Sequence, residues 1–164
     1  MVRGNGITAI GGSDTHRPDP NVEHGTPTTW VLAKARTVES ILEAIRKGWV
    51  CISSTLEGPR IAIQKGHASV GVKKGKPQVA VSGAKAGQVV KLFSEKGVEE
   101  RYVIPESVDN WSSDVRVAAA HFYRVELWSE GEGLLLNFLT TSVEYFSLTL
   151  MDTSAIFSSC FLYT

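Results

Sequence analysis

A carboxylate and an imidazole lie two residues apart in the segment Gly-Gly-Ser-Asp-Thr-His, as Asp14 and His16. The apolar stretch before them ends at Gly11 and Gly12, where the backbone can turn and aim both side chains the same way. A hard carboxylate oxygen together with a borderline imidazole nitrogen suits divalent Mn, Zn or Fe. The pair therefore predicts two metal ligands. The competing interpretation is that Asp14 caps the following turn and that His16 is solvated.

One arginine and three further histidines bear on this site. Arg17 follows His16 directly and could bind an anionic group of a substrate, with a solvated loop arginine as the alternative. We interpret His24, in the long polar loop, as solvated rather than as a ligand. His67 falls in a polar turn and His121 beside strand residues, so neither is assigned a metal role. No residue is predicted to be catalytic.

Strands and one helix surround the pair in the first third of the chain. Residues 7–10 form a short apolar run that predicts a buried strand ending at the two glycines. The polar, proline-containing residues 13–26 predict a loop, and residues 29–33 and 49–53 predict two more strands. The metal pair is thus expected just past the end of a strand.

Residues 37–47 give the clearest helix signal. Thr37 can act as the N-cap, and Glu39 places a negative charge in the first turn, where the helix dipole favours it. Gly48 is well placed to end the helix in a left-handed conformation. One apolar face follows the i, i+3, i+4, i+7 spacing, made of Val38, Ile41, Leu42 and Ile45.

The pattern changes near Gly58-Pro59. Short alternating stretches then recur about every ten residues, separated by glycines and charged turns, which predicts a β-sandwich. These stretches are residues 60–64, 78–82, 88–94, 100–104, 115–119 and 123–128. Trp111 falls between them and is predicted to lie in a loop. We place a boundary here, dividing the chain into residues 1–56 and 57–164.

Composition limits the classes of partner. Apolar residues make up 43% of the chain, so a packed core is expected. Seventeen basic and seventeen acidic residues give no formal net charge, and no basic stripe argues for nucleic acid.

No signal peptide or long apolar run is visible, so we expect a cytoplasmic protein that does not interact with membranes. Residues 147–164 carry one charge, Asp152, and form either a final strand or a non-native terminus.

Several segments together resemble the end of the polymerase-and-histidinol-phosphatase (PHP) family, closest to its carbaryl-hydrolase-like branch. They are Gly-Gly-Ser-Asp-Thr-His-Arg-Pro at 11–18, Gly-Thr-Pro-Thr-Thr-Trp-Val at 25–31, Ile-Leu-Glu-Ala-Ile-Arg-Lys-Gly at 41–48 and Gly-Pro at 58–59. The stretch 122–146 looks like the late strands of the region that follows the barrel in that branch. The resemblance implies an α+β fold: the end of a (β/α)7 PHP-type barrel, then a mainly antiparallel β-sandwich. It also implies that Asp14 and His16 bind catalytic metals.

The chain departs from the family pattern in its other ligands. The family's His-x-His motif and its further His, Glu and His ligands should precede Ile7, and only six residues do so. A metal ion that activates water needs about three protein ligands and an open position. The chain alone is therefore expected to hold divalent Mn, Zn or Fe weakly at most and to be catalytically inactive. The missing ligands would come from upstream of Met1 or from another chain.

Two functions follow as alternatives. The first is the carboxyl-terminal part of a metal-dependent hydrolase, acting on a small phosphoester or a related ester. The second is a non-catalytic β-sandwich module for binding or assembly, with a vestigial barrel fragment. A homo-oligomer that covers exposed strand edges is a further alternative, because unpaired edges recruit partners.

Overall fold

The computed structural model describes residues 7–17, 20, 24–65, 77–105, 109–116, 120, 122–129, 131, 133–142 and 161–162 of the chain. His67, His121 and most of the 147–164 tail lie outside these residues, so their predicted roles stay predictions. Within the described part, no helix has the length and apolar character needed to cross a membrane.

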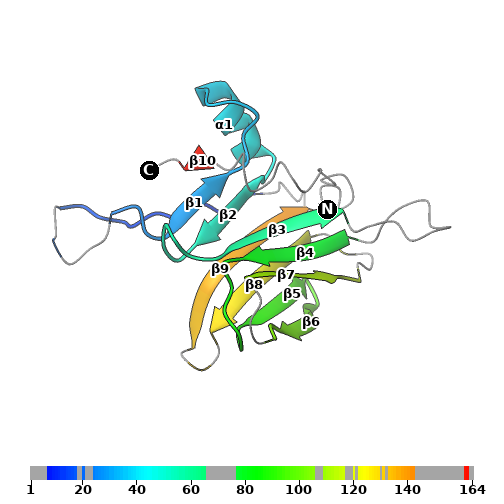
Figure 1. The fold of residues 1–164 in the computed structure, drawn as a ribbon. Coiled ribbons are helices and arrows are strands. Elements are labelled where there is room, and N and C mark those ends of the chain that lie inside the picture. The colour runs from blue at the N-terminus through cyan, green and yellow to red at the C-terminus, as the bar shows by residue number, and fades with distance from the viewer. Residues whose placement is uncertain are drawn as a thin grey trace.

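The described chain is mainly antiparallel β structure with one short helix (Figure 1). A seven-stranded sheet has the order β10-β1-β2-β9-β8-β5-β6, and a three-stranded sheet has the order β3-β4-β7. The helix is α1 (Val38–Arg46). The strands are β1 (Thr28–Val31), β2 (Val50–Ser53), β3 (Arg60–Lys65), β4 (Pro77–Ser82), β5 (Val89–Ser94), β6 (Gly97–Val103), β7 (Asn110–Asp114), β8 (Phe122–Ser129), β9 (Leu134–Ser142) and β10 (Phe161–Leu162).

The two sheets pack face to face over one hydrophobic core. In β8, every second residue points into this core, as Tyr123, Val125 and Leu127. In the neighbouring strand β5, Leu92 lies opposite Val125 and Val90 lies opposite Leu127, and both are buried. The three-stranded sheet covers these side chains from the other side, with its own buried residues Ile61, Ile63, Val79 and Val81. The predicted β-sandwich character is therefore confirmed.

Strands β1 and β2 bury side chains on both faces. Trp30 and Cys51, which lie opposite each other, join the sandwich core. The next pair, Val31 and Val50, faces the other way and packs with Ala44 of α1 in a second cluster. Helix α1 thus covers the outer face of this end of the sheet (Figure 1).

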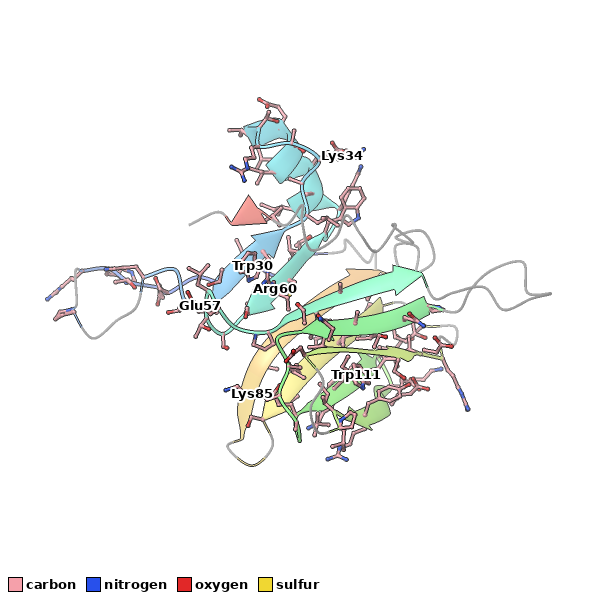
Figure 2. All side chains as sticks on the ribbon, in the orientation of Figure 1. Trp30, Lys34, Glu57, Arg60, Lys85 and Trp111 are labelled. Atoms are coloured by element: carbon pink, nitrogen blue, oxygen red, sulfur yellow. The ribbon has the colours of Figure 1, made fainter. Side chains whose placement is uncertain are left out.

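The chain passes from one sheet to the other between β2 and β3. The Ser53 hydroxyl at the end of β2 donates to the carbonyl of Pro59, 2.9 Å away, and this bond closes the connecting turn. At the start of β3, the Arg60 guanidinium stacks over the Trp30 ring, with Cζ 4.5 Å from the ring centroid (Figure 2). The two sheets are therefore linked at this corner by a cation–π contact as well as by the core.

The predicted helix is confirmed, and its ends have the predicted causes. Thr37 is the N-cap, and its hydroxyl accepts from the Ser40 amide at 3.3 Å. Glu39 lies in the first turn, and Gly48 has a φ of 71°, a left-handed conformation that favours glycine. The predicted buried face is only partly correct: Ile41 and Ile45 pack against the cluster that contains Ala44, but Val38 and Leu42 have 59% and 43% of their surface exposed.

Two predicted elements are wrong. Residues 7–10 form no strand, and Ile7 and Ile10 have 87% and 63% of their surface exposed. A strand is found at Asn110–Asp114, where none was predicted; of the predicted strand at 115–119, Val115 and Arg116 are irregular, and residues 117–119 lie outside the described residues. Trp111 is consequently a half-buried strand residue packed against the core, not a loop residue.

The expected boundary near residue 57 falls between β2 and β3. Strands β1 and β2, which precede it, belong to the same sheet as β5, β6, β8 and β9, which follow it. All described strand pairs are antiparallel, including β1 with β2. A (β/α) barrel is built from parallel strand pairs, so the antiparallel pair β1–β2 gives no support to a barrel. The barrel assignment of residues 1–56 stays a prediction that rests on the sequence resemblance alone.

Candidate functional site

The segment that carries Asp14 and His16 is anchored on β1 by a two-way hydrogen bond. The Thr29 hydroxyl accepts from the Gly11 amide at 2.8 Å and donates to the Gly11 carbonyl at 3.0 Å. Three residues earlier, the Thr8 hydroxyl donates to the carbonyl of Ile45 in α1 at 2.6 Å. Side chains therefore satisfy the backbone groups of Gly11 that a strand ladder would otherwise satisfy.

Gly11 is packed too closely for a side chain. A Cβ atom there would lie 2.8 Å from Cγ2 of Ile52, 3.1 Å from Cγ of Pro27 and 3.3 Å from the Pro27 carbonyl oxygen. A Cβ atom at Gly12 would have no neighbour within 4 Å. The close approach at Gly11 fixes where the segment lies against Ile52 and Pro27, three residues before the first predicted ligand, Asp14.

Asp14 and His16 are brought together by a tight local turn. Asp14 has a φ of 52°, a left-handed conformation that aspartate adopts more readily than most residues. The Nδ1 atom of His16 lies 2.8 Å from the Asp14 carbonyl oxygen. A carbonyl oxygen can only accept, so Nδ1 carries the proton and the Nε2 lone pair is left for another partner. This arrangement, a ring N–H on a backbone carbonyl, is how metal-binding histidines are commonly oriented.

The pair is open to solvent. The side chains of Asp14 and His16 are 95% and 81% exposed, and the imidazole Nδ1 lies 3.9 Å from the nearer Asp14 carboxylate oxygen. Within the described residues, no group of three or more His, Cys, Asp or Glu side chains could hold a metal ion. The two side chains are of types that ligate divalent metals, but they lack the burial that strengthens ligation, so metal binding by this pair stays a prediction.

The structure does not bring the other sequence candidates into a common site. Arg17 and His24 are both exposed. Neither joins Asp14 and His16 in a cluster of metal-ligating side chains. Substrate binding by Arg17 therefore stays a prediction.

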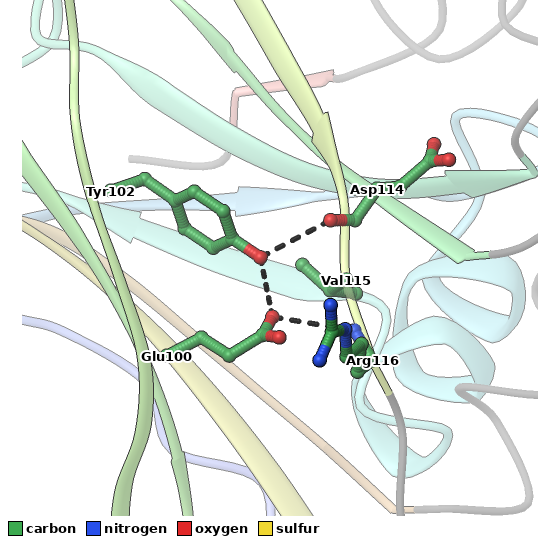
Figure 3. A pocket seen from close by; sticks show the side chains of 5 residues that line it. All are labelled: Glu100, Tyr102, Asp114, Val115 and Arg116. Atoms are coloured by element: carbon green, nitrogen blue, oxygen red, sulfur yellow. Dashed lines mark hydrogen bonds between the residues drawn. The ribbon is translucent and has the colours of Figure 1, made fainter.

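A second candidate site, which no sequence motif predicted, lies where the edge strands of the two sheets meet. Strand β6 ends the seven-stranded sheet and β7 ends the three-stranded sheet. A cavity of about 370 Å³ lies between them (Figure 3). It is lined by Glu100, Tyr102, Asp114, Val115 and Arg116.

Hydrogen bonds cross this seam through Tyr102. Its hydroxyl bonds to the Glu100 carboxylate and lies 3.1 Å from the Asp114 carbonyl oxygen (Figure 3). The Arg116 amide donates to the same Glu100 carboxylate at 3.3 Å. The Tyr102 ring also packs against Trp111 of β7, with ring centroids 5.6 Å apart. Two side chains of β6, Tyr102 and Glu100, therefore connect the two sheets here.

This environment changes the acidity of the phenol. Burial, followed by the hydrogen bond and the negative charge of Glu100, raises the pKa of Tyr102 from 10.0 to about 12. Between these two values, the unfolded chain loses the phenolic proton and the folded chain keeps it. Stability from this group is complete below pH 10.0 and declines as the pH rises towards about 12.

We expect Tyr102→Phe to flatten the alkaline fall in stability. Urea unfolding of wild type and variant should be compared below pH 10.0 and again between pH 10.0 and 12. The variant lacks the hydroxyl hydrogen bonds in both pH ranges, so that loss is the same in each. It also lacks the phenolic proton that titrates in the upper range. Parallel loss of stability in both proteins across this window would contradict the prediction.

Comparison with known proteins identifies no relative: the chain matches no protein-family model, no curated protein and no solved structure.

Proposed function

We propose that the chain is the carboxyl-terminal part of a metal-dependent hydrolase, and that Asp14 and His16 supply two ligands of its divalent-metal site. The support is the orientation of His16, whose Nδ1–H points to the Asp14 carbonyl oxygen at 2.8 Å and whose Nε2 remains a donor for a metal. The resemblance of residues 11–59 to the PHP family supplies the reaction class, hydrolysis of a phosphoester or a related ester.

The residues of this chain would position the metal rather than complete its site. The Gly11–Thr29 bonds fix the start of the turn, and the left-handed Asp14 backbone folds it back onto His16. A divalent Mn, Zn or Fe ion would lower the pKa of a bound water and stabilise negative charge on the scissile group. Two exposed ligands give weak ligation, so further ligands must complete a working site.

Metal titration tests the ligand assignment. Calorimetry with Zn²⁺ and NMR line broadening with Mn²⁺ should show binding on the order of 0.1 mM, with broadening centred on Asp14 and His16. Asp14→Ala and His16→Ala should each weaken it about tenfold or more. The exposed loop residue His24 offers a matched control, and His24→Ala should bind metal as the wild type does.

Turnover is tested in the same samples. We expect no metal-dependent hydrolysis of p-nitrophenyl phosphate by this chain alone. Robust turnover that disappears in Asp14→Ala would show that the chain is active by itself. Metal binding that is unchanged in both alanine variants would remove the ligand assignment and, with it, the hydrolase proposal.

The continuity of the seven-stranded sheet favours a second candidate, a non-catalytic β-sandwich module. Because β1 and β2 pair into the same sheet as the later strands, residues before and after 57 share structure. This candidate predicts that Mn²⁺ broadens no signal at Asp14 or His16 selectively. The titration above therefore separates the two functions.

A further inference from the structure

The cavity between β6 and β7 is lined by side chains of opposite charge. Glu100 offers a carboxylate, and Arg116 offers a guanidinium, so their formal charges cancel. Asp114 is the third charged residue of the lining, but its carboxylate bonds to Gln78 Nε2 at 2.6 Å and points away from the Tyr102 hydroxyl (Figure 3). The lining therefore presents both signs of charge, with one more carboxylate than guanidinium.

The Glu100 carboxylate has one oxygen engaged and one available. Its Oε2 receives both the Tyr102 hydroxyl and the Arg116 amide. Among the described residues, Oε1 receives no hydrogen bond. These bonds hold the carboxylate in place, so its second oxygen is an acceptor in a fixed position at the cavity.

The mixed lining selects ligands by the kind of hydrogen bond they make. A simple cation would satisfy Glu100 and be repelled by Arg116, and a simple anion would do the reverse. A hydroxyl group can donate to the carboxylate and accept from the guanidinium at the same time. A ligand with adjacent hydroxyls satisfies both groups without bringing a net charge into the cavity.

The Tyr102 ring and Val115 form the apolar part of the lining. The Tyr102 ring packs against Trp111, and Val115 is buried. A cavity of about 370 Å³ lies at the small end of the range of about 300 to 1,000 Å³ for small-molecule sites. Apolar surface flanked by a few fixed polar groups suits a compact ring that has C–H faces and hydroxyl edges.

We propose that the cavity between β6 and β7 is a binding site for a neutral polyhydroxylated ligand, a sugar residue. Glu100 would accept from its hydroxyls, Arg116 would donate to them, and the Tyr102 ring and Val115 would contact its C–H face. The site uses none of the residues of the proposed metal site, so each proposal can fail without the other.

Titration of the ¹⁵N-labelled chain tests this site, with D-glucose, D-galactose and D-mannose as probes. The Arg116 amide, bonded to Glu100, and the Trp111 indole N–H, beside Tyr102, report on the cavity directly. We expect saturable shifts of both signals with at least one hexose, with a dissociation constant of about 10 mM or tighter. Arg116→Gln and Glu100→Gln should each weaken binding about tenfold.

Other ligands and variants decide between outcomes. Arg36→Gln changes an exposed arginine that does not line the cavity and should leave the hexose affinity unchanged. Chemical shifts that stay unaltered away from each substitution will show that the variants fold. Butylammonium chloride, sodium acetate and glycine serve as cationic, anionic and zwitterionic probes. Saturable shifts with any of these and none with the hexoses would overturn the proposal, as would no shift with any hexose or an affinity unaffected by Arg116→Gln and Glu100→Gln.

Discussion

Leu92→Ala is expected to lower the free energy of unfolding by about 3 kcal/mol. Leu92 is fully buried in β5, between Val125 of β8 on one side and Glu100 of β6 on the other. Its side chain fills the centre of the core between the sheets, where the surrounding strands cannot close a cavity fully. Since a whole domain is stable by about 5 to 15 kcal/mol, urea unfolding followed by tryptophan fluorescence should show a large shift in midpoint.

The same experiment tests whether the chain divides near residue 57. Trp30 lies in β1, before that point, yet it belongs to the same core as Leu92. We therefore expect one unfolding transition in which all tryptophan signals shift together. A matched control is Val98→Ala, because Val98 is exposed on the edge strand β6 and its loss should change stability little. Two separate transitions, only one of them moved by Leu92→Ala, would instead support two domains.

Gly11→Ala is expected to cost about 1 to 3 kcal/mol and to loosen the segment that carries Asp14 and His16. The new methyl group would lie 2.8 Å from Ile52 Cγ2, 3.1 Å from Pro27 Cγ and 3.3 Å from the Pro27 carbonyl oxygen. The backbone must shift, which would break the bonds between Gly11 and Thr29. Urea unfolding gives the stability change, and the amide shifts of Gly11 and Thr29 show whether the anchor is lost.

Gly12 offers the control for that substitution. A Cβ atom there meets nothing within 4 Å, and Gly12 is not among the described glycines with a positive φ. Gly12→Ala should therefore be neutral or slightly stabilising. Equal losses in the two variants would mean that the close packing at Gly11 is not what holds the segment on the sheet.

Local sequence signals predicted the helix and most strands because their causes are local. The Thr37 cap, the acidic first turn and Gly48 act within a few residues of one another, and the structure confirms each of them. The alternating strands after residue 57 were also predictable, since every second side chain enters the core. In that part of the predicted pattern, the stretch nearest to β7 began five residues late, and no alternating stretch was predicted for β9 (Leu134–Ser142).

Tertiary contacts explain what the sequence could not predict. Residues 7–10 are apolar enough for a strand. The segment is instead held by side-chain hydrogen bonds, from the Thr8 hydroxyl to Ile45 and between Gly11 and the Thr29 hydroxyl, and not by backbone pairing with a strand. Trp111 lies in a polar stretch that carries no apolar alternation, and its burial comes from contact with Tyr102 on the other sheet. The cavity beside it depends on which strands become edges, a property of the topology and not of any motif.

The position of β6 at the end of its sheet has a consequence for self-association. An exposed edge offers unpaired backbone groups to a second molecule, and charges or bulges along it discourage such pairing. Strand β6 carries Glu99, Glu100 and Arg101 in succession, and its pairing with β5 shifts register between Leu92 and Phe93. The Glu100 carboxylate, which lines the cavity, thus also helps to discourage the pairing of this edge strand with a second molecule.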